Sequence, residues 1–235
     1  MTVSLKPARI DARLIATFAF AIVFISALLF AAAGTWRWPE AWLFVLLYAS
    51  LSVGSRYLVA LRHPDLIQER ARMASAPDAQ KWDKALAPLV ALGGSIALLV
   101  VAGLDHRFGW SPQVPVWVKA VGLAALLAGF AFSTWAMLAN RFFSAVVRIQ
   151  SDRGHTVVSE GPYRYVRHPG YTGAVICYLA IPLALGALWA LVPAALTIAL
   201  TVLRTALEDR TLQAGLPGYA DYAQRVRYRL LPGVW

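Results

Sequence analysis

A segment rich in histidine, tyrosine and arginine, residues 150–171, has a composition that suits a binding site. It reads QSDRGHTVVSEGPYRYVRHPGY. The pair Gly161-Pro162 signals a turn, and Pro169 moves the backbone of His168 away from the helical region. Residues 156–158 are β-prone and favour extended chain. We therefore expect irregular backbone here, with free hydrogen-bonding groups surrounded by aromatic rings.

A second candidate pair, Arg204 and Glu208, follows a long uncharged stretch. On a helix the spacing i, i+4 places both side chains on one face, close to the end of the apolar segment. An arginine there can hold a carboxylate or phosphate through two parallel hydrogen bonds. An ordinary exposed ion pair, worth about 0.3–0.5 kcal/mol, is the simpler alternative.

The composition of the chain points to a membrane protein. Of 235 residues, 59% are hydrophobic and 14% are charged, against about 45–50% and about 25% in soluble domains. This excludes a disordered chain. The net charge of +10 comes from basic residues placed between apolar runs, so we expect no nucleic-acid partner. Cys177 is the single cysteine, which excludes a cysteine-based zinc cluster, and we expect no metal site.

Uncharged or nearly uncharged stretches mark the candidate membrane spans. They are residues 14–36, 41–61, 85–104, 120–140 and 170–203. The last stretch has 34 residues and would extend about 51 Å as one helix, too far for a single crossing. Pro182, Gly186 and Pro193 interrupt it. The sequence thus predicts an all-α, polytopic membrane protein of about six transmembrane helices, the last two forming a short hairpin.

The distribution of basic residues predicts the orientation. With six spans, the inner segments hold 18 Lys and Arg residues and the outer turns hold 3, which places both termini in the cytoplasm. The first apolar run is longer than a signal-peptide core, which favours a retained helix over a cleaved leader. We expect a multi-pass integral membrane protein, in the inner (plasma) membrane if the source is bacterial.

The two polar segments flank the predicted hairpin, so both should lie on the cytoplasmic face and enclose a pocket. Irregular backbone at membrane depth is tolerated where it lines a cavity. We predict one membrane-embedded domain over 1–235, with four N-terminal spans in 1–140. Residues 141–235 would form the catalytic region with the hairpin and the C-terminal tail.

Several motifs in the C-terminal third resemble a known family. They are GPYRYVRHPGYTG at 161–173, R-x-x-x-E-D-x-x-L from Arg204 to Leu212, and GYADY at 218–222. Together they resemble the isoprenylcysteine carboxyl methyltransferase family, whose wider group includes bacterial phospholipid methyltransferases. The resemblance covers residues 150–235. It implies methyl transfer from S-adenosylmethionine, with the cofactor enclosed by the last helices and the cytoplasmic tail.

The resemblance also implies roles for individual residues. Glu208 matches the family's cofactor-binding glutamate, and Arg204 matches an arginine assigned to the substrate, so these two form the expected catalytic pair. The other expected cofactor-binding residues are Gln150, His155, Thr156, Val157, Val158, Tyr163, His168, Pro169, Gly170 and Tyr171. The sequence departs from the family where a run of glutamates is reduced to Glu208-Asp209.

This chemistry is consistent with the residues present. Tyrosine faces attract a sulfonium by about 0.5–2 kcal/mol each, and the activated methyl group mainly requires positioning and exclusion of water. A carboxylate acceptor needs no base; an amine acceptor needs one, and His168 is the nearest candidate. The acceptor would be a lipophilic molecule entering from the bilayer, and Arg225, Arg227 and Arg229 would contact anionic membrane lipids.

Two other functions are compatible with the same layout. One is an NADPH-dependent membrane reductase of the steroid-reductase type, which has a similar arrangement of helices. The other is a non-catalytic membrane subunit or a transporter. A transporter should show paired broken helices in two halves, and this chain has one polar-rimmed hairpin without a counterpart.

Overall fold

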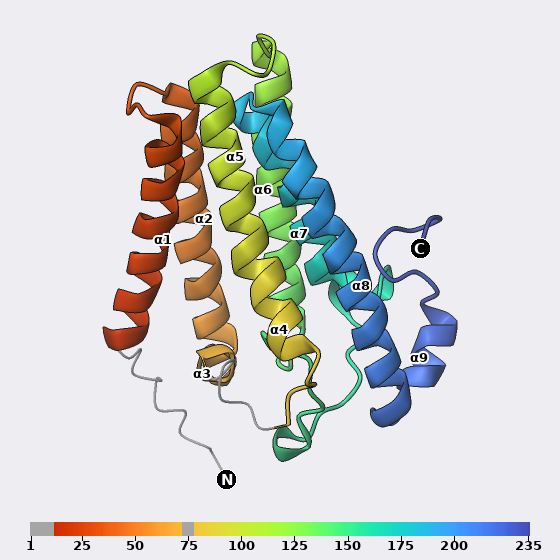
Figure 1. The fold of residues 1–235 in the computed structure, drawn as a ribbon. Helices are drawn as coiled ribbons and strands as arrows, with labels where there is room; N and C mark the ends of the chain where they lie inside the picture. The colour runs from red at the N-terminus through yellow and green to blue at the C-terminus, as the bar shows by residue number, and fades with distance from the viewer. Residues whose placement is uncertain (1–11, 72–77) are drawn as a thin grey trace.

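Long apolar helices lie side by side and form most of the molecule (Figure 1). The computed structural model describes residues 12–71 and 78–235, and these residues contain helices and no strands. The helices are α1 Ala12–Ala33, α2 Pro39–Arg62, α3 Pro64–Ala71, α4 Asp83–Pro88, a π-helical turn η2 Leu89–Gly94, α5 Ser95–Phe108, α6 Val116–Ala139, α7 Pro169–Leu185, α8 Leu191–Gly215 and α9 Tyr219–Arg225. Short 3₁₀ turns cover Ser151–Arg153, Gly161–Arg164 and Leu188–Ala190.

The all-helical fold expected from the sequence is found. Four helical segments are long and apolar enough to cross a membrane: Pro39–Arg62, Asp83–Phe108, Val116–Ala139 and Leu188–Gly215. Two shorter apolar helices, Ala19–Ala33 and Pro169–Leu185, accompany them. The expected count of six spans therefore remains a prediction.

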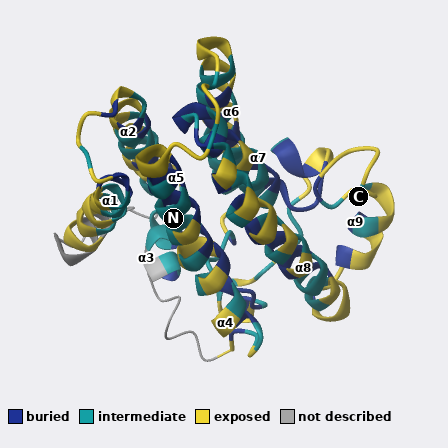
Figure 2. Cartoon of the chain, turned by 45° about the horizontal axis from the view of Figure 1, so that its top comes forward, coloured by how far each residue is buried: buried dark blue, intermediate teal, exposed yellow. Residues whose placement is uncertain are grey.

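The outward faces of the bundle are apolar as well as exposed (Figure 2). Large side chains such as Phe20, Leu46, Val53, Val121 and Leu196 are all more than half exposed. A soluble monomer rarely exposes apolar surface on this scale, because water disfavours it. Hydrocarbon is the natural solvent for these faces.

The long uncharged stretch 170–203 is divided between two helices. Pro169 occupies the first turn of α7, where its missing N–H leaves no intrahelical bond unmade. Gly186 ends α7 in the left-handed conformation, with φ of +67°. After the 3₁₀ turn Leu188–Ala190, α8 begins at Leu191.

Close contact between α6 and α7 depends on glycine. An ideal Cβ on Gly173 would collide with Ser133 Oγ and lie 2.5 Å from the carbonyl oxygen of Gly129. A Cβ on Gly129 would lie 2.7 Å from Cys177 Sγ. The two helix backbones approach each other here because neither residue has a side chain.

The polar segments of the sequence gather at one end of the bundle (Figure 1). This end holds α3, the segment between α6 and α7, the C-terminal part of α8, and α9. Residues distant in sequence meet at this end. Arg153 pairs with Asp65 across 88 positions, and Arg204 pairs with Asp83 across 121.

Replacing Gly173 with alanine should destabilise the protein. The added methyl group has no room between α6 and α7, and overpacking of this kind costs about 1–3 kcal/mol. Gly54→Ala is the matched control, because Gly54 also lies within a long helix but has open space around it. Thermal unfolding in detergent should show a lower Tm for Gly173→Ala and an unchanged or higher Tm for Gly54→Ala; equal Tm values would contradict the close contact.

Candidate functional site

A cavity of about 380 Å³ lies at the polar end of the bundle. Its volume falls in the range of about 300–1,000 Å³ that small-molecule sites occupy. The structure brings together at this cavity all the predicted site residues except Pro169, which is buried at the start of α7. They are Gln150, His155, Thr156, Val157, Val158, Tyr163, His168, Gly170, Tyr171, Arg204 and Glu208.

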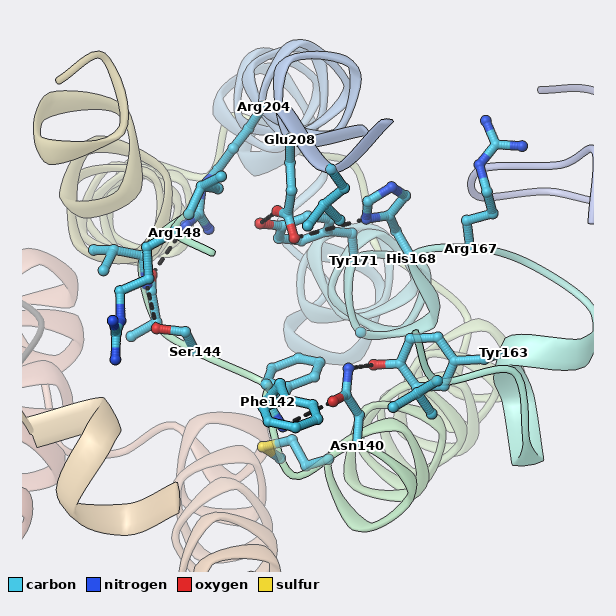
Figure 3. Close-up of a pocket in the computed structure, with 18 of the residues that line it drawn as sticks. Asn140, Phe142, Ser144, Arg148, Tyr163, Arg167, His168, Tyr171, Arg204 and Glu208 are labelled. Atoms are coloured by element: carbon cyan, nitrogen blue, oxygen red, sulfur yellow. Dashed lines mark hydrogen bonds and ion pairs between the residues drawn. The ribbon is translucent and has the colours of Figure 1, made fainter. Parts of the chain in front are cut away.

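Glu208 is the carboxylate at the centre of this group (Figure 3). Its Oε2 accepts a hydrogen bond of 2.5 Å from the Tyr171 hydroxyl, and its Oε1 lies 3.9 Å from His168 Nδ1. Helix α8 supplies Glu208, and the start of α7 supplies the other two residues. Because Glu208 has no arginine or lysine within ion-pair distance among the described residues, its charge remains available to a ligand.

Arg204 is bound to a carboxylate that the sequence analysis did not identify. Its Nε and Nη2 donate to Asp83 at 2.7 and 2.9 Å, and Nη2 also donates to the carbonyl oxygen of Ala145 at 2.9 Å. Asp83 is fully buried and also accepts the backbone N–H of Val147. Arg204 therefore lines the cavity with its ion pair already formed, and its guanidinium lies 5.3 Å from the Tyr171 ring centre.

Gln150 and His155 close a small loop beside the cavity. The Gln150 side chain donates to the carbonyl oxygen of Phe142 at 2.7 Å and accepts a hydrogen bond from Arg153. Its backbone N–H donates to His155 Nδ1 at 3.2 Å. Both polar atoms of the Gln150 side chain therefore have partners within the protein, and the residue shapes the cavity wall.

The environment of His155 keeps its imidazole neutral. Burial, followed by the positive charges of Arg148 and Arg153, lowers the pKa of His155 to about 4. The hydrogen bond from Gln150 requires an unprotonated Nδ1, which agrees with this direction.

Asn140, at the end of α6, joins two parts of the opposite wall (Figure 3). Its Nδ2 donates to the Tyr163 hydroxyl at 3.1 Å, and its Oδ1 accepts the backbone N–H of Phe142 at 2.8 Å. Burial raises the pKa of Tyr163 above its ordinary value, so the phenol stays protonated. The wall presents a neutral aromatic surface toward Glu208.

A second carboxylate, Asp209, lies directly behind the site. It is fully buried and accepts hydrogen bonds from Arg167 at 2.8 and 2.9 Å, Arg229 at 2.9 Å and Tyr219 at 3.1 Å. His168 Nε2 lies 3.3 Å from it. Asp209 thereby connects α8, the start of α7, α9 and the C-terminal tail around the cavity.

The tail is also attached through its backbone. The N–H groups of Arg167 and His168 donate to the carbonyl oxygens of Tyr228 and Arg229 at 2.9 and 3.0 Å. Tyr222, on α9, donates to the carbonyl oxygen of Tyr163 at 2.7 Å. This arrangement makes Tyr219 and Tyr222 part of the cavity lining.

Sequence reasoning missed Asp83, Asp209, Asn140 and Arg70 as residues of the site or its support. Each acid does leave a signal, since it stands at the end of an apolar stretch, where an unpaired charge is costly. The sequence does not show which arginine binds each acid, because that arginine belongs to a distant element. Among the described residues, no group of three or more His, Cys, Asp or Glu side chains is placed to hold a metal ion.

Comparison with known proteins supports the resemblance found in the sequence. Residues 117–216 match the phospholipid methyltransferase family model. A cobalt-zinc-cadmium resistance protein of Cupriavidus metallidurans is 32% identical over 135 residues, which are 55% of this chain and 57% of that protein. The family resemblance is confirmed.

Two plant relatives match a shorter segment. A probable protein-S-isoprenylcysteine O-methyltransferase of Oryza sativa subsp. indica is 38% identical over 60 residues, 25% of this chain and 31% of its own length. Protein-S-isoprenylcysteine O-methyltransferase B of Arabidopsis thaliana is 33% identical over 61 residues, 26% and 31% of the two chains. The chain thus spans little more than half of the first relative and under a third of the plant proteins.

The methyltransferase family match covers one part of the site. Residues 117–216 include α6, α7, α8 and the segment 150–171, and hence every residue assigned to the site from the sequence. Asp83 and Arg70 lie outside it. Together with the apolar helices, the match identifies an integral membrane protein.

Acid should destabilise the loop around His155. Because the pKa of this imidazole is lowered from about 6.5 to about 4, its stabilising contribution is complete above pH 6.5. That contribution decreases as the pH falls toward 4. Two-dimensional NMR of the histidine side chains should show a neutral His155 at pH 6, and an apparent pKa near 6.5 would contradict the buried environment.

Replacing Asp209 with asparagine should release the C-terminal tail. Removing one partner of a buried ion pair costs about 3–5 kcal/mol, because the other charge remains buried. Trypsin should then cleave faster after Arg225 and Arg227. Asp221→Asn removes an exposed acid from α9 and serves as the control; equal cleavage rates in the two variants would contradict the role of Asp209.

Proposed function

We propose that the protein is an integral membrane methyltransferase that transfers a methyl group from S-adenosylmethionine to a lipophilic acceptor. The observation that supports this most directly is the cavity itself. Glu208, without an arginine or lysine partner among the described residues, faces a wall of tyrosines in the segment that matches the phospholipid methyltransferase family.

The donor set of the cavity fits the proposed cofactor. S-adenosylmethionine supplies an activated methyl group on a cationic sulfur, together with a cationic amino group. Glu208 can accept hydrogen bonds from the amino or ribose groups, and the faces of Tyr163, Tyr171 and Tyr219 can lie against the positive charge. Residues 155–158 lie outside any helix. The His155 N–H donates to the carbonyl oxygen of Gln150, and the backbone groups of residues 156–158 can bind an adenine edge.

The remaining lining suits an acceptor from the bilayer. Val90 and Ala91 of the π-helical turn, Met137 of α6 and Ala174 of α7 form an apolar section of the wall. These elements belong to the apolar helices or adjoin them, so a hydrocarbon chain could remain in the membrane while its head group reaches the cavity. An isoprenylated cysteine carboxylate, the kind of group named for the plant relatives, is one acceptor of this type.

The protein's contribution to transfer would be positioning and exclusion of water. Tyr171 is oriented by its hydrogen bond to Glu208, and Tyr163 by Asn140. Helix α9 and the tail, held by Asp209, cover the site from one side. A site aligned in this way lowers the barrier because the reacting groups are already in place. We further propose that the cavity opens to the cytoplasm, with both termini on that side.

The proposal is tested by cofactor binding. Glu208→Gln keeps the size of the side chain and the bond from Tyr171 but removes the negative charge. Hydrogen bonds to a charged group contribute about 1.5–3 kcal/mol, so the Kd for S-adenosylhomocysteine should rise about 10- to 100-fold in calorimetry. Glu160→Gln, which neutralises an exposed acid of the same segment, should leave the Kd unchanged.

A thermal-shift measurement with each cofactor separates the methyltransferase from the reductase. S-adenosylhomocysteine should raise the Tm of the wild-type protein, and NADPH should not. Stabilisation by NADPH alone would favour a reductase of the steroid-reductase type. Stabilisation by neither would remove the basis for a cofactor site.

A further inference from the structure

Four arginines line the cavity, and three of them are already neutralised. Each of the three donates to a buried carboxylate at 2.7–2.9 Å. The pairs are Arg148 with Glu69, Arg167 with Asp209 and Arg204 with Asp83. The fourth arginine, Arg70 at the end of α3, has no carboxylate partner among the described residues.

Arg70 contacts only neutral groups among the described residues. Its Nη1 donates to the carbonyl oxygens of Phe143 and Ser144 at 3.3 and 3.5 Å, and its guanidinium lies 5.4 Å from the centre of the Phe143 ring. No described carboxylate forms an ion pair with it. Arg70 is half-buried at the cavity, and two long hydrogen bonds and one ring contact leave most of its N–H donors unused among the described residues.

The groups around Arg70 disfavour its positive charge. Burial, and then the positive charges of Arg56 and Arg204, lower the pKa of Arg70 to about 10. Excess positive potential therefore remains at this part of the cavity. An anion placed beside Arg70 would relieve it and form charge-assisted hydrogen bonds.

The cavity thus has an acid without an arginine or lysine partner and an arginine without a carboxylate partner among the described residues. Glu208 is the single acidic side chain that lines it, and Arg70 is the single lining arginine without a carboxylate partner in the described part of the chain. Tyr171 donates a hydrogen bond to Glu208, whereas Arg70 contacts Phe143. The site is suited to cationic groups near Glu208 and to an anionic group near Arg70.

We propose that Arg70 binds the anionic group, a carboxylate or a phosphate, of the lipophilic acceptor. This inference rests on the proposed methyltransferase function and adds a positioning residue from outside the family match, which begins at residue 117. An anion held by Arg70 would bring the head group of the acceptor into the cavity while its hydrocarbon chain stays in the bilayer.

The position of Arg70 favours the acceptor over the cofactor as its ligand. Arg70 donates to the carbonyl oxygen of Ser144, and the carbonyl oxygen of the next residue, Ala145, accepts a hydrogen bond from Arg204. The two arginines therefore bind neighbouring peptide groups of one wall segment. Arg204 is the residue that the family resemblance connects with the substrate.

The test compares Arg70→Ala and Arg70→Lys with Arg62→Ala, which removes an exposed arginine one helix earlier. Full-length protein in detergent is titrated with S-farnesyl-N-acetylcysteine and, in a separate arm, with dioleoylphosphatidic acid. Each has an uncharged counterpart, the amide of the first and dioleoylglycerol for the second. Binding is followed by thermal shift, so the readout does not require turnover.

We expect the wild-type protein to prefer one anionic probe over its uncharged counterpart by at least about tenfold. The arm in which this occurs identifies a carboxylate or a phosphate. Arg70→Ala should abolish the preference, Arg70→Lys should retain part of it, and Arg62→Ala should leave it intact. With methyl-labelled cofactor, the Arg70 variants should raise the KM for the acceptor more than they lower kcat.

Three outcomes would overturn the inference. One is a wild-type protein that binds anionic and uncharged probes equally. Another is an unchanged preference in Arg70→Ala. The third is an Arg70→Ala variant that loses affinity for S-adenosylhomocysteine but keeps its affinity for 5′-methylthioadenosine, which lacks the amino-acid carboxylate. Arg70 would then hold the cofactor. Failure of the wild-type protein to bind S-adenosylhomocysteine contradicts the proposed function instead, and the anion titration distinguishes the two cases.

Discussion

The site depends on ion pairs between buried carboxylates and arginines at the polar end of the bundle. Asp209 and Asp83 are both fully buried, and each accepts two hydrogen bonds from one arginine. Moving a charge out of water is expensive unless a partner is close and well oriented. Asp209 meets this requirement by connecting four parts of the chain, so the tail, α9 and the start of α7 adopt one arrangement around the cavity.

The same rule explains which groups remain for a ligand. Once Asp83 has bound Arg204 and Asp209 has bound Arg167, the lining residues without an oppositely charged partner in the described chain are Glu208 and Arg70. Charges that support the fold are bound in ion pairs, whereas charges that bind a ligand remain without a partner, at a cost in stability. The arrangement leaves one acidic and one basic position inside the same cavity. The family resemblance connects Arg204 with the substrate. In the structure Arg204 lines the cavity and is also bound to Asp83.

Much of the fold could be read from apolar runs and their interruptions. The predicted spans 14–36, 41–61 and 120–140 correspond to α1, α2 and α6 within a few residues. A long apolar segment in hydrocarbon forms a helix because a helix satisfies all its backbone hydrogen bonds internally. The break in 170–203 follows from Gly186, whose left-handed conformation ends α7. The π-helical turn at Leu89–Gly94 was not foreseen. It follows Pro88, which lacks an N–H, and packs closely against Thr197 of α8 at Gly94, a tertiary contact.

The sequence by itself determined the class of the molecule and the local chemistry. Composition indicated a membrane protein. The two polar segments on either side of the predicted hairpin, together with the family resemblance, indicated a common site for His168, Tyr171 and Glu208. Only the tertiary structure decided which charges are paired. Asp83 and Arg204 are 121 positions apart, and nothing local to either residue specifies the other. Arg70 became a candidate by the same reasoning, since the lack of a carboxylate partner can be recognised only when every neighbour in space is known.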